Sequence, residues 1–118
     1  MPYISANDDR REALRNGEPA LLAGELNYQI FYHIKHALER KIYGEDLRDL
    51  IKDFIQQFLG EKPNYQRYND MTGALIRCQK ELKRRLNSDY DLFDIMEDYD
   101  EEIEIYEDKK IKENTDVE

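Results

Sequence analysis

Aromatic, amide and basic side chains recur in this sequence at spacings that could bind a small ligand. Tyrosine is abundant, with nine in the chain, and there is no tryptophan. A ring can stack on a base, and a nearby guanidinium can hold a phosphate. Tyrosine also packs at helix boundaries, so a structural role stays open beside the functional one. The candidate ligand-binding residues are Glu25, Asn27, Tyr28, Tyr65, Tyr68, Asn69, Lys80, Arg84 and Arg85.

A second candidate site is the acidic run in the last third of the chain. Residues 89–108 include eleven aspartates or glutamates and no lysine or arginine. Taking these eleven charges from the net charge of −9 leaves +2 for the rest, so the acidity is local. Such a run could bind a basic partner or imitate nucleic-acid phosphates, or serve solubility alone. The candidate partner-binding residues are Asp98, Asp100, Glu101, Glu102 and Glu104.

Histidine, cysteine and carboxylate spacings predict no metal site, no cofactor and no catalytic residues. His33, His36 and Glu39 follow one another at steps of three, which spreads them over a wide arc of a helix. The acidic run lacks the glycine that a calcium-binding loop needs. Cys78, the only cysteine, lies on an apolar stripe and is expected to be a buried packing residue.

Apolar periodicity predicts three long helices that would position the candidate residues. The clearest pattern covers residues 45–59 and is closed by Gly60. Another helix is predicted over residues 19–41, with Gly24 as an alternative start, and a third over residues 64–86. The apolar stripe of the helix at 19–41 consists of Leu22, Leu26, Ile30, Ile34 and Leu38. That of the helix at 64–86 consists of Tyr68, Met71, Leu75, Cys78, Leu82 and Leu86.

Shorter elements are predicted before the first long helix and after the last one. Residues 1–6 should be extended because Pro2 opposes an early helix, and a short helix should follow over residues 10–15. In the acidic run a helix is favoured over residues 90–100, docked against the basic face at residues 77–85. The side chains that would hold it there are Leu92, Met96 and Tyr99.

Together these elements predict an all-α protein: a small antiparallel helical bundle with an extended N-terminus and an acidic C-terminal segment. The 118 residues have the size of a single domain, with a core at 18–88 and the acidic segment 89–118 packing back on it. No apolar stretch is long enough for a membrane span or a signal peptide, so we expect a cytoplasmic protein. A core of this size would gain from self-association, so we expect a homo-oligomer.

Four stretches, in order along the chain, resemble a small uncharacterised family of bacterial, archaeal and phage proteins. They are MPYI at the start, GELNY at 24–28, YQRYNDMTGALIRCQKELKRRL at 65–86 and YEDKKIKENTDVE at 106–118. The resemblance implies a prokaryotic or phage-infected cell as the setting. It also implies that the tail packs near Glu25, Asn27, Tyr68 and Arg84. It implies no particular reaction.

The leading hypothesis for function is a non-catalytic binding protein. In a phage it would suit inhibition of host defence, through binding a host or viral protein or a small phosphorylated ligand, without direct nucleic-acid or membrane contact. One alternative is a magnesium-dependent enzyme of nucleotide or phosphate chemistry that uses Glu25 and Glu81 on facing helices. Another alternative is an acidic mimic of nucleic acid that acts through residues 89–108.

Overall fold

The computed structural model describes residues 8–40 and 45–104, and these residues form helices joined by short loops, without strands. The prediction of an all-α protein is confirmed. The helices are α1 (Asp8–Arg15), α2 (Ala23–Arg40), α3 (Glu45–Leu59), α4 (Tyr65–Leu86) and α5 (Leu92–Glu97), and residues 100–104 are again helical. The predicted extended start and the tail motif at 106–118 lie outside the described residues. Within them, no helix is long and apolar enough to cross a membrane.

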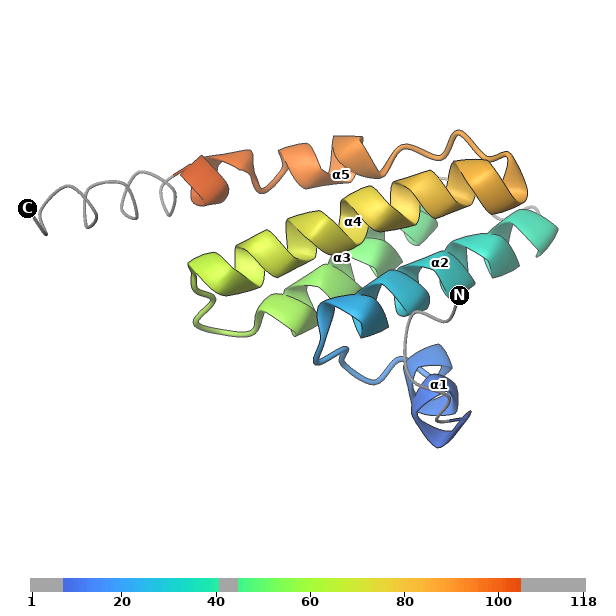
Figure 1. The fold of residues 1–118 in the computed structure, drawn as a ribbon, viewed down its shortest axis with the longest axis horizontal. Helices are drawn as coiled ribbons and strands as arrows, with labels where there is room; N and C mark the ends of the chain where they lie inside the picture. The colour runs from blue at the N-terminus through green and yellow to red at the C-terminus, as the bar shows by residue number, and fades with distance from the viewer. Residues whose placement is uncertain (1–7, 41–44, 105–118) are drawn as a thin grey trace, which may run out of the picture.

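The helices α2, α3 and α4 lie side by side, and one hydrophobic core fills the space between them (Figure 1). The helix α5 lies along α4, and α1 packs at an angle against α2. The core contains the apolar stripes of all five helices. Its largest fully buried side chains are Leu14, Leu26, Ile30, Ile34, Ile51, Ile55, Phe58, Met71, Leu75, Leu82, Leu92 and Ile95.

Helix α3 follows its sequence pattern from end to end. Its predicted range of 45–59 is the observed one, and Gly60 ends it with a φ of 78°, a backbone conformation that glycine adopts without strain. The next helix starts at its cap: the Asn64 side chain accepts a hydrogen bond from the Arg67 amide at 2.9 Å. Short loops with defined caps therefore set the spacing of α3 and α4.

Helix α2 begins later than the apolar stripe suggests. Leu22, expected at the start of the stripe, is 67% exposed, because the helix starts only at Ala23. The preceding turn is fixed instead by Gln29, a fully buried side chain on α2. Its Nε2 donates to the carbonyl of Leu14 at 2.9 Å and to that of Glu18 at 2.8 Å. One buried amide thus attaches the end of α1 to α2.

The acidic run folds into two short helical pieces rather than one helix over 90–100. Helix α5 ends at Glu97, residues 98–99 form a turn, and residues 100–104 are helical. The apolar side chains that hold the run in place are Leu92, Ile95 and Tyr99, all buried, whereas Met96 is only half-buried. Apolar packing therefore attaches residues 92–99, with Leu92, Ile95 and Tyr99 buried and Met96 packed against them in part.

The charged partners of the acidic run lie mainly on α3 and not on the basic face of α4. Arg48 pairs with Asp94 and, at 3.0 Å, with Asp98, and Lys52 donates to Asp98 at 2.9 Å. From the predicted basic face, Lys83 forms an ion pair with Asp89 of the acidic run, at 3.1 Å. Arg48 and Lys52 lie one turn apart on α3, so both can reach Asp98. The periodicity of the acidic run cannot indicate partners on another helix.

Candidate functional site

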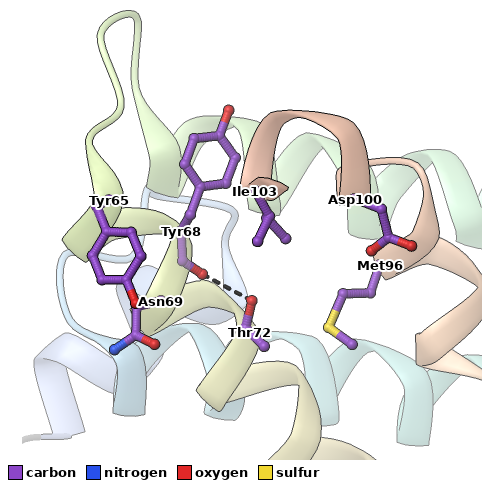
Figure 2. A pocket seen from close by; sticks show the side chains of 7 residues that line it. All are labelled: Tyr65, Tyr68, Asn69, Thr72, Met96, Asp100 and Ile103. Carbon is purple, nitrogen blue, oxygen red and sulfur yellow. Dashed lines mark hydrogen bonds between the residues drawn. The ribbon is translucent and has the colours of Figure 1, made fainter. Parts of the chain in front are cut away.

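A pocket with a volume of about 170 Å³ lies between α4 and the acidic segment. Figure 2 shows Tyr65 and Asn69 at one end of it, Met96 and Asp100 at the other, and Thr72 and Ile103 between them. Its lining residues are Tyr65, Tyr68, Asn69, Thr72, Met96, Asp100 and Ile103. Three of the residues that the sequence proposed for ligand binding, Tyr65, Tyr68 and Asn69, thus come together with one proposed for partner binding, Asp100.

One wall of the pocket is a single face of α4. Tyr65, Tyr68, Asn69 and Thr72 follow at steps of three and four residues, so a helix places them in one row. The Thr72 hydroxyl donates to the Tyr68 carbonyl at 2.9 Å, the dashed line in Figure 2. Tyr68 is almost entirely buried, whereas Tyr65 is only half-buried. This wall therefore offers an aromatic surface with amide and hydroxyl groups beside it.

The opposite wall comes from the turn at 98–99 and the residues around it. Tyr99 is the anchor: its ring is buried, and its hydroxyl accepts a hydrogen bond from Gln56 Nε2 at 3.0 Å. Burial raises the pKa of Tyr99. Because Tyr99 points inward, Asp100 next to it is exposed, and Met96 and Ile103 stand on either side. The turn thereby brings a carboxylate and two apolar side chains to the pocket.

The charge of the pocket favours a cation. Of the described residues that line it, Asp100 is the one with a formal charge, and none is a lysine or arginine. An aromatic ring, a thioether and a carboxylate all interact favourably with an ammonium or guanidinium group. A phosphate would meet the Asp100 carboxylate with no cation to offset it. The pocket therefore suits a cationic side chain better than the phosphorylated ligand expected from the sequence.

The carboxylates of the acidic run divide into two sets. Asp89, Asp94 and Asp98 form ion pairs, and Asp91 caps α5 by accepting from the amides of Phe93 and Asp94. The hydrogen bond from Lys52 lowers the pKa of Asp98. The second set is exposed and makes no ion pair within the described residues: Glu97, Asp100, Glu101, Glu102 and Glu104. Four of the five proposed partner-binding residues are in this second set, and Asp98 belongs to the first.

A second cavity of about 190 Å³ lies between α2 and α4. It adds one more of the proposed residues, Asn27 from α2, and places it near Asn69 of α4, which lines both cavities. Its lining residues are Ala23, Gly24, Asn27, Asn69, Asp70, Gly73, Ala74 and Arg77. The two cavities therefore lie on either side of Asn69.

Glu25 has a different environment from the one expected of a ligand-binding carboxylate. It is 7% exposed and accepts two hydrogen bonds from Arg10, at 2.7 and 2.8 Å, and one from the Leu21 amide at 2.8 Å. The hydrogen bond from Arg10 lowers the pKa of Glu25. Glu81, its predicted partner on the facing helix, forms an ion pair with Arg84 at 2.7 Å. Both carboxylates of the proposed magnesium site are thus bound by guanidinium groups.

The other proposed residues line neither cavity. The Tyr28 hydroxyl accepts from Arg15 Nε at 2.7 Å, and its ring stacks on Tyr32. Arg85 lies over the ring of Phe31, with 4.9 Å between its guanidinium carbon and the ring centroid. Lys80 is exposed on α4. Within the described part of the chain, no three His, Cys, Asp or Glu side chains are arranged to hold a metal ion.

Several residues of the two cavities were missed from the sequence. Thr72 could have been found, since it continues the row of Tyr65, Tyr68 and Asn69 by one further turn of the helix. Met96 and Ile103 could not, because their approach depends on the turn at 98–99 and on the attachment of that turn to α3. The remaining missed residues, all in the second cavity, are Ala23, Gly24, Asp70, Gly73, Ala74 and Arg77.

Fold and site together define a small all-α protein with an acid-lined aromatic pocket. The chain belongs to a family described as a domain of unknown function (DUF6899), whose family model matches residues 1–101. Membership of an uncharacterised family agrees with the resemblance noted in the sequence, and the tail motif at 106–118 falls beyond the matched residues. Neither a curated protein nor a solved structure matches the chain.

Proposed function

We propose that this protein is a non-catalytic binding protein whose acidic C-terminal face binds a basic segment of a partner protein. One lysine or arginine of that segment enters the pocket between α4 and the acidic run, and its neighbours face the exposed carboxylates around it. The observation that carries the proposal is Asp100, a carboxylate without an ion pair in the described structure, placed in a pocket of aromatic and apolar side chains.

The shape of the pocket supports a side chain as its occupant. A volume of about 170 Å³ is below the range of about 300–1,000 Å³ that is usual for drug-sized ligands. The apolar stem of a lysine or arginine can lie against Ile103 and Met96 while its charged end reaches Asp100, as long basic side chains commonly do. Tyr65 is positioned to contribute the face of its ring.

The carboxylates around the pocket that have no ion pair among the described residues support a basic segment rather than a single small cation. Within the helical residues 100–104, Glu104 follows Asp100 and Glu101 at steps of four and three, so these three carboxylates share one side of the segment. Like charges at these spacings destabilise a helix by about 0.2–0.5 kcal/mol per pair. A partner with several positive charges removes that repulsion and associates faster through long-range attraction.

Imitation of nucleic acid is a special case of the same proposal, in which the partner's basic surface is one that binds nucleic acid. The sequence resemblance adds the expectation that such a partner belongs to a host defence system of a phage-infected cell, and self-association of this chain stays a prediction. Mimicry relies on evenly spaced charges and so predicts equal losses from Asp100→Asn and Glu104→Gln. Binding through the pocket predicts that Asp100 contributes more.

The proposal is tested with a basic probe peptide, since the natural partner is unidentified. Fluorescence anisotropy with labelled octalysine and octaarginine should show saturable binding that weakens with added salt. Asp100→Asn should weaken it by about tenfold or more, because a charge-assisted hydrogen bond is worth about 1.5–3 kcal/mol. The matched control is Asp89→Asn, which removes the same charge from an exposed position outside the pocket.

Two results would count against the proposal. If octalysine and octaarginine do not bind at low salt, the acidic face is not a site for basic segments. If Asp89→Asn and Asp100→Asn weaken binding by the same factor, the pocket has no part in it and only the net charge matters.

A further inference from the structure

The cavity between α2 and α4, with Asn27, Asn69, Gly73 and Arg77 in its lining, has features that packing of the two helices does not explain. It is independent of the acidic face, apart from the shared residue Asn69. We refer to it as the α2–α4 groove. Three observations on it point to a bound small molecule, and each concerns a different kind of group.

The first observation is the glycine in the middle of α4. Gly73 has ordinary helical backbone geometry, and a Cβ added to it would meet no atom within 4 Å. Glycine inside a helix costs about 1 kcal/mol relative to alanine. Neither a turn nor close packing of α2 requires it here. Room for an occupant of the groove is a sufficient reason, because glycine permits the close approach of a ligand to the backbone.

The second observation is a buried amide without a partner. Asn27 is only 4% exposed and lines the groove, and its Oδ1 has no hydrogen-bond partner in the described structure. Leaving a buried polar group unsatisfied costs about 1–3 kcal/mol. A ligand that donates an N–H or O–H to Asn27 would remove this cost.

The third observation is a pair of opposite charges in the lining. Arg77 lines the groove and makes no hydrogen bond or ion pair with the described residues. Asp70 also lines the groove and is held by Gln66 Nε2 at 2.8 Å. The two formal charges cancel, so the lining suits a neutral zwitterion better than a phosphate dianion, which Asp70 would repel.

We propose that the α2–α4 groove binds a free amino acid. Its carboxylate pairs with Arg77, the residue type best suited to hold a carboxylate through two hydrogen bonds. Its ammonium group donates to Asn27 and faces Asp70, and its side chain lies beside Gly73. The groove volume of about 190 Å³ limits the ligand to a small molecule of this kind.

The test is a titration of the full-length protein, followed by two-dimensional NMR of the backbone amides, with each of the common amino acids. At least one should cause saturable shifts at Asn27, Asn69, Gly73 and Arg77. The N-acetyl derivative of that amino acid lacks the ammonium group, and its amide lacks the carboxylate. Each should bind at least about tenfold more weakly than the zwitterion, because each loses a charge-assisted hydrogen bond.

Two variants test the residues, with a matched control. Arg77→Gln should weaken binding by about tenfold or more, whereas Lys80→Gln, on the same helix outside the groove, should leave it unchanged. Gly73→Ala should raise the thermal midpoint of unfolding by roughly 4 °C and still weaken binding. A variant that is more stable and binds less well cannot owe its loss of binding to misfolding.

The proposal is wrong if no amino acid produces saturable shifts in the groove. It is also wrong if inorganic phosphate or phosphoserine binds there while unmodified amino acids do not, or if Arg77→Gln and Lys80→Gln have equal effects. Because octalysine binding is measured separately on the acidic face, failure here leaves the proposed function intact, and the reverse also holds.

Discussion

At the scale of single residues, the role of each carboxylate depends on which donors reach it. Glu25 is bound by Arg10 and the Leu21 amide, and so belongs to the folded framework. Asp100 has no such donors in the described structure and faces a pocket. In the sequence both residues are simply acidic. The hydrogen-bond donors of Glu25 cannot be identified there, because Arg10 lies fifteen positions away. This is why the sequence proposed Glu25 for ligand binding, although its partners make it part of the folded framework.

Replacing Glu25 by glutamine should destabilise the protein by about 2 kcal/mol, because Arg10 then loses a charge-assisted partner in a largely buried setting. The check is chemical denaturation near neutral pH. Arg10→Gln combined with Glu25→Gln should cost less than the two single changes added together, since each single change leaves one side chain without its charged partner. Additive losses would mean that the two side chains do not act as a pair.

The Arg10–Glu25 pair should also give the protein an acid-sensitive stability. Hydrogen bonding to Arg10 lowers the pKa of Glu25 in the folded state below its ordinary value of 4.5. The stabilisation is therefore fully present above pH 4.5 and is lost as the pH falls through the lower, folded-state pKa. Denaturation midpoints measured across this range should fall less steeply for Glu25→Gln than for the unchanged protein. Parallel curves would contradict the assignment.

Cys78 should be chemically silent in the folded protein. Its side chain is fully buried, and burial raises the pKa of the thiol far above its ordinary value, so almost no thiolate is present at neutral pH. Reaction with a chromogenic disulfide reagent should proceed only as fast as the protein opens, and it should become immediate in denaturant. Rapid labelling under native conditions would show that α4 is not packed as described.

At the scale of elements, the sequence predicted helices well where one amphipathic stripe decided the outcome. The helix at 45–59 has apolar residues at every expected step and was predicted over its full length. Residues 90–100 of the acidic run were predicted as one helix, and they contain a turn at 98–99 instead. Its Asp98 is held by Arg48 and Lys52 on α3, and its Tyr99 by Gln56 on the same helix. Contacts across more than forty positions leave no periodic signal in the run itself.

The attachment of α5 should depend on its apolar side chains and not on its ion pairs. Leu92 is fully buried, so Leu92→Ala should destabilise the protein by about 2–4 kcal/mol. Arg48→Gln removes the ion pairs to Asp94 and Asp98, which are solvent-exposed and screened, and should cost far less. Chemical denaturation of the two variants measures both losses in the free energy of unfolding and shows which is larger. A larger loss from Arg48→Gln would show that electrostatics holds the acidic segment in place.

At the scale of the whole molecule, charge is distributed so that the acidic face repels itself. The net charge of −9 comes from the acidic run, where several carboxylates have no ion pair in the described residues. Salt screens this repulsion, and it also screens attraction to a basic partner. Raising the ionic strength from about 0.05 M to about 0.5 M should therefore increase the free energy of unfolding while weakening octalysine binding. If stability falls as well, ion pairs such as those of Arg48 dominate over the repulsion.

NMR mapping of the octaarginine complex decides whether a cationic side chain occupies the pocket between α4 and the acidic run. If it does, the largest shifts occur at Tyr65, Thr72, Met96 and Asp100, around the pocket, with smaller ones at Glu101 and Glu104. Asp100→Asn should then remove the shifts at Tyr65 and Met96. Changes spread evenly over the exposed carboxylates, with Tyr65 and Met96 unaffected, would contradict this occupancy.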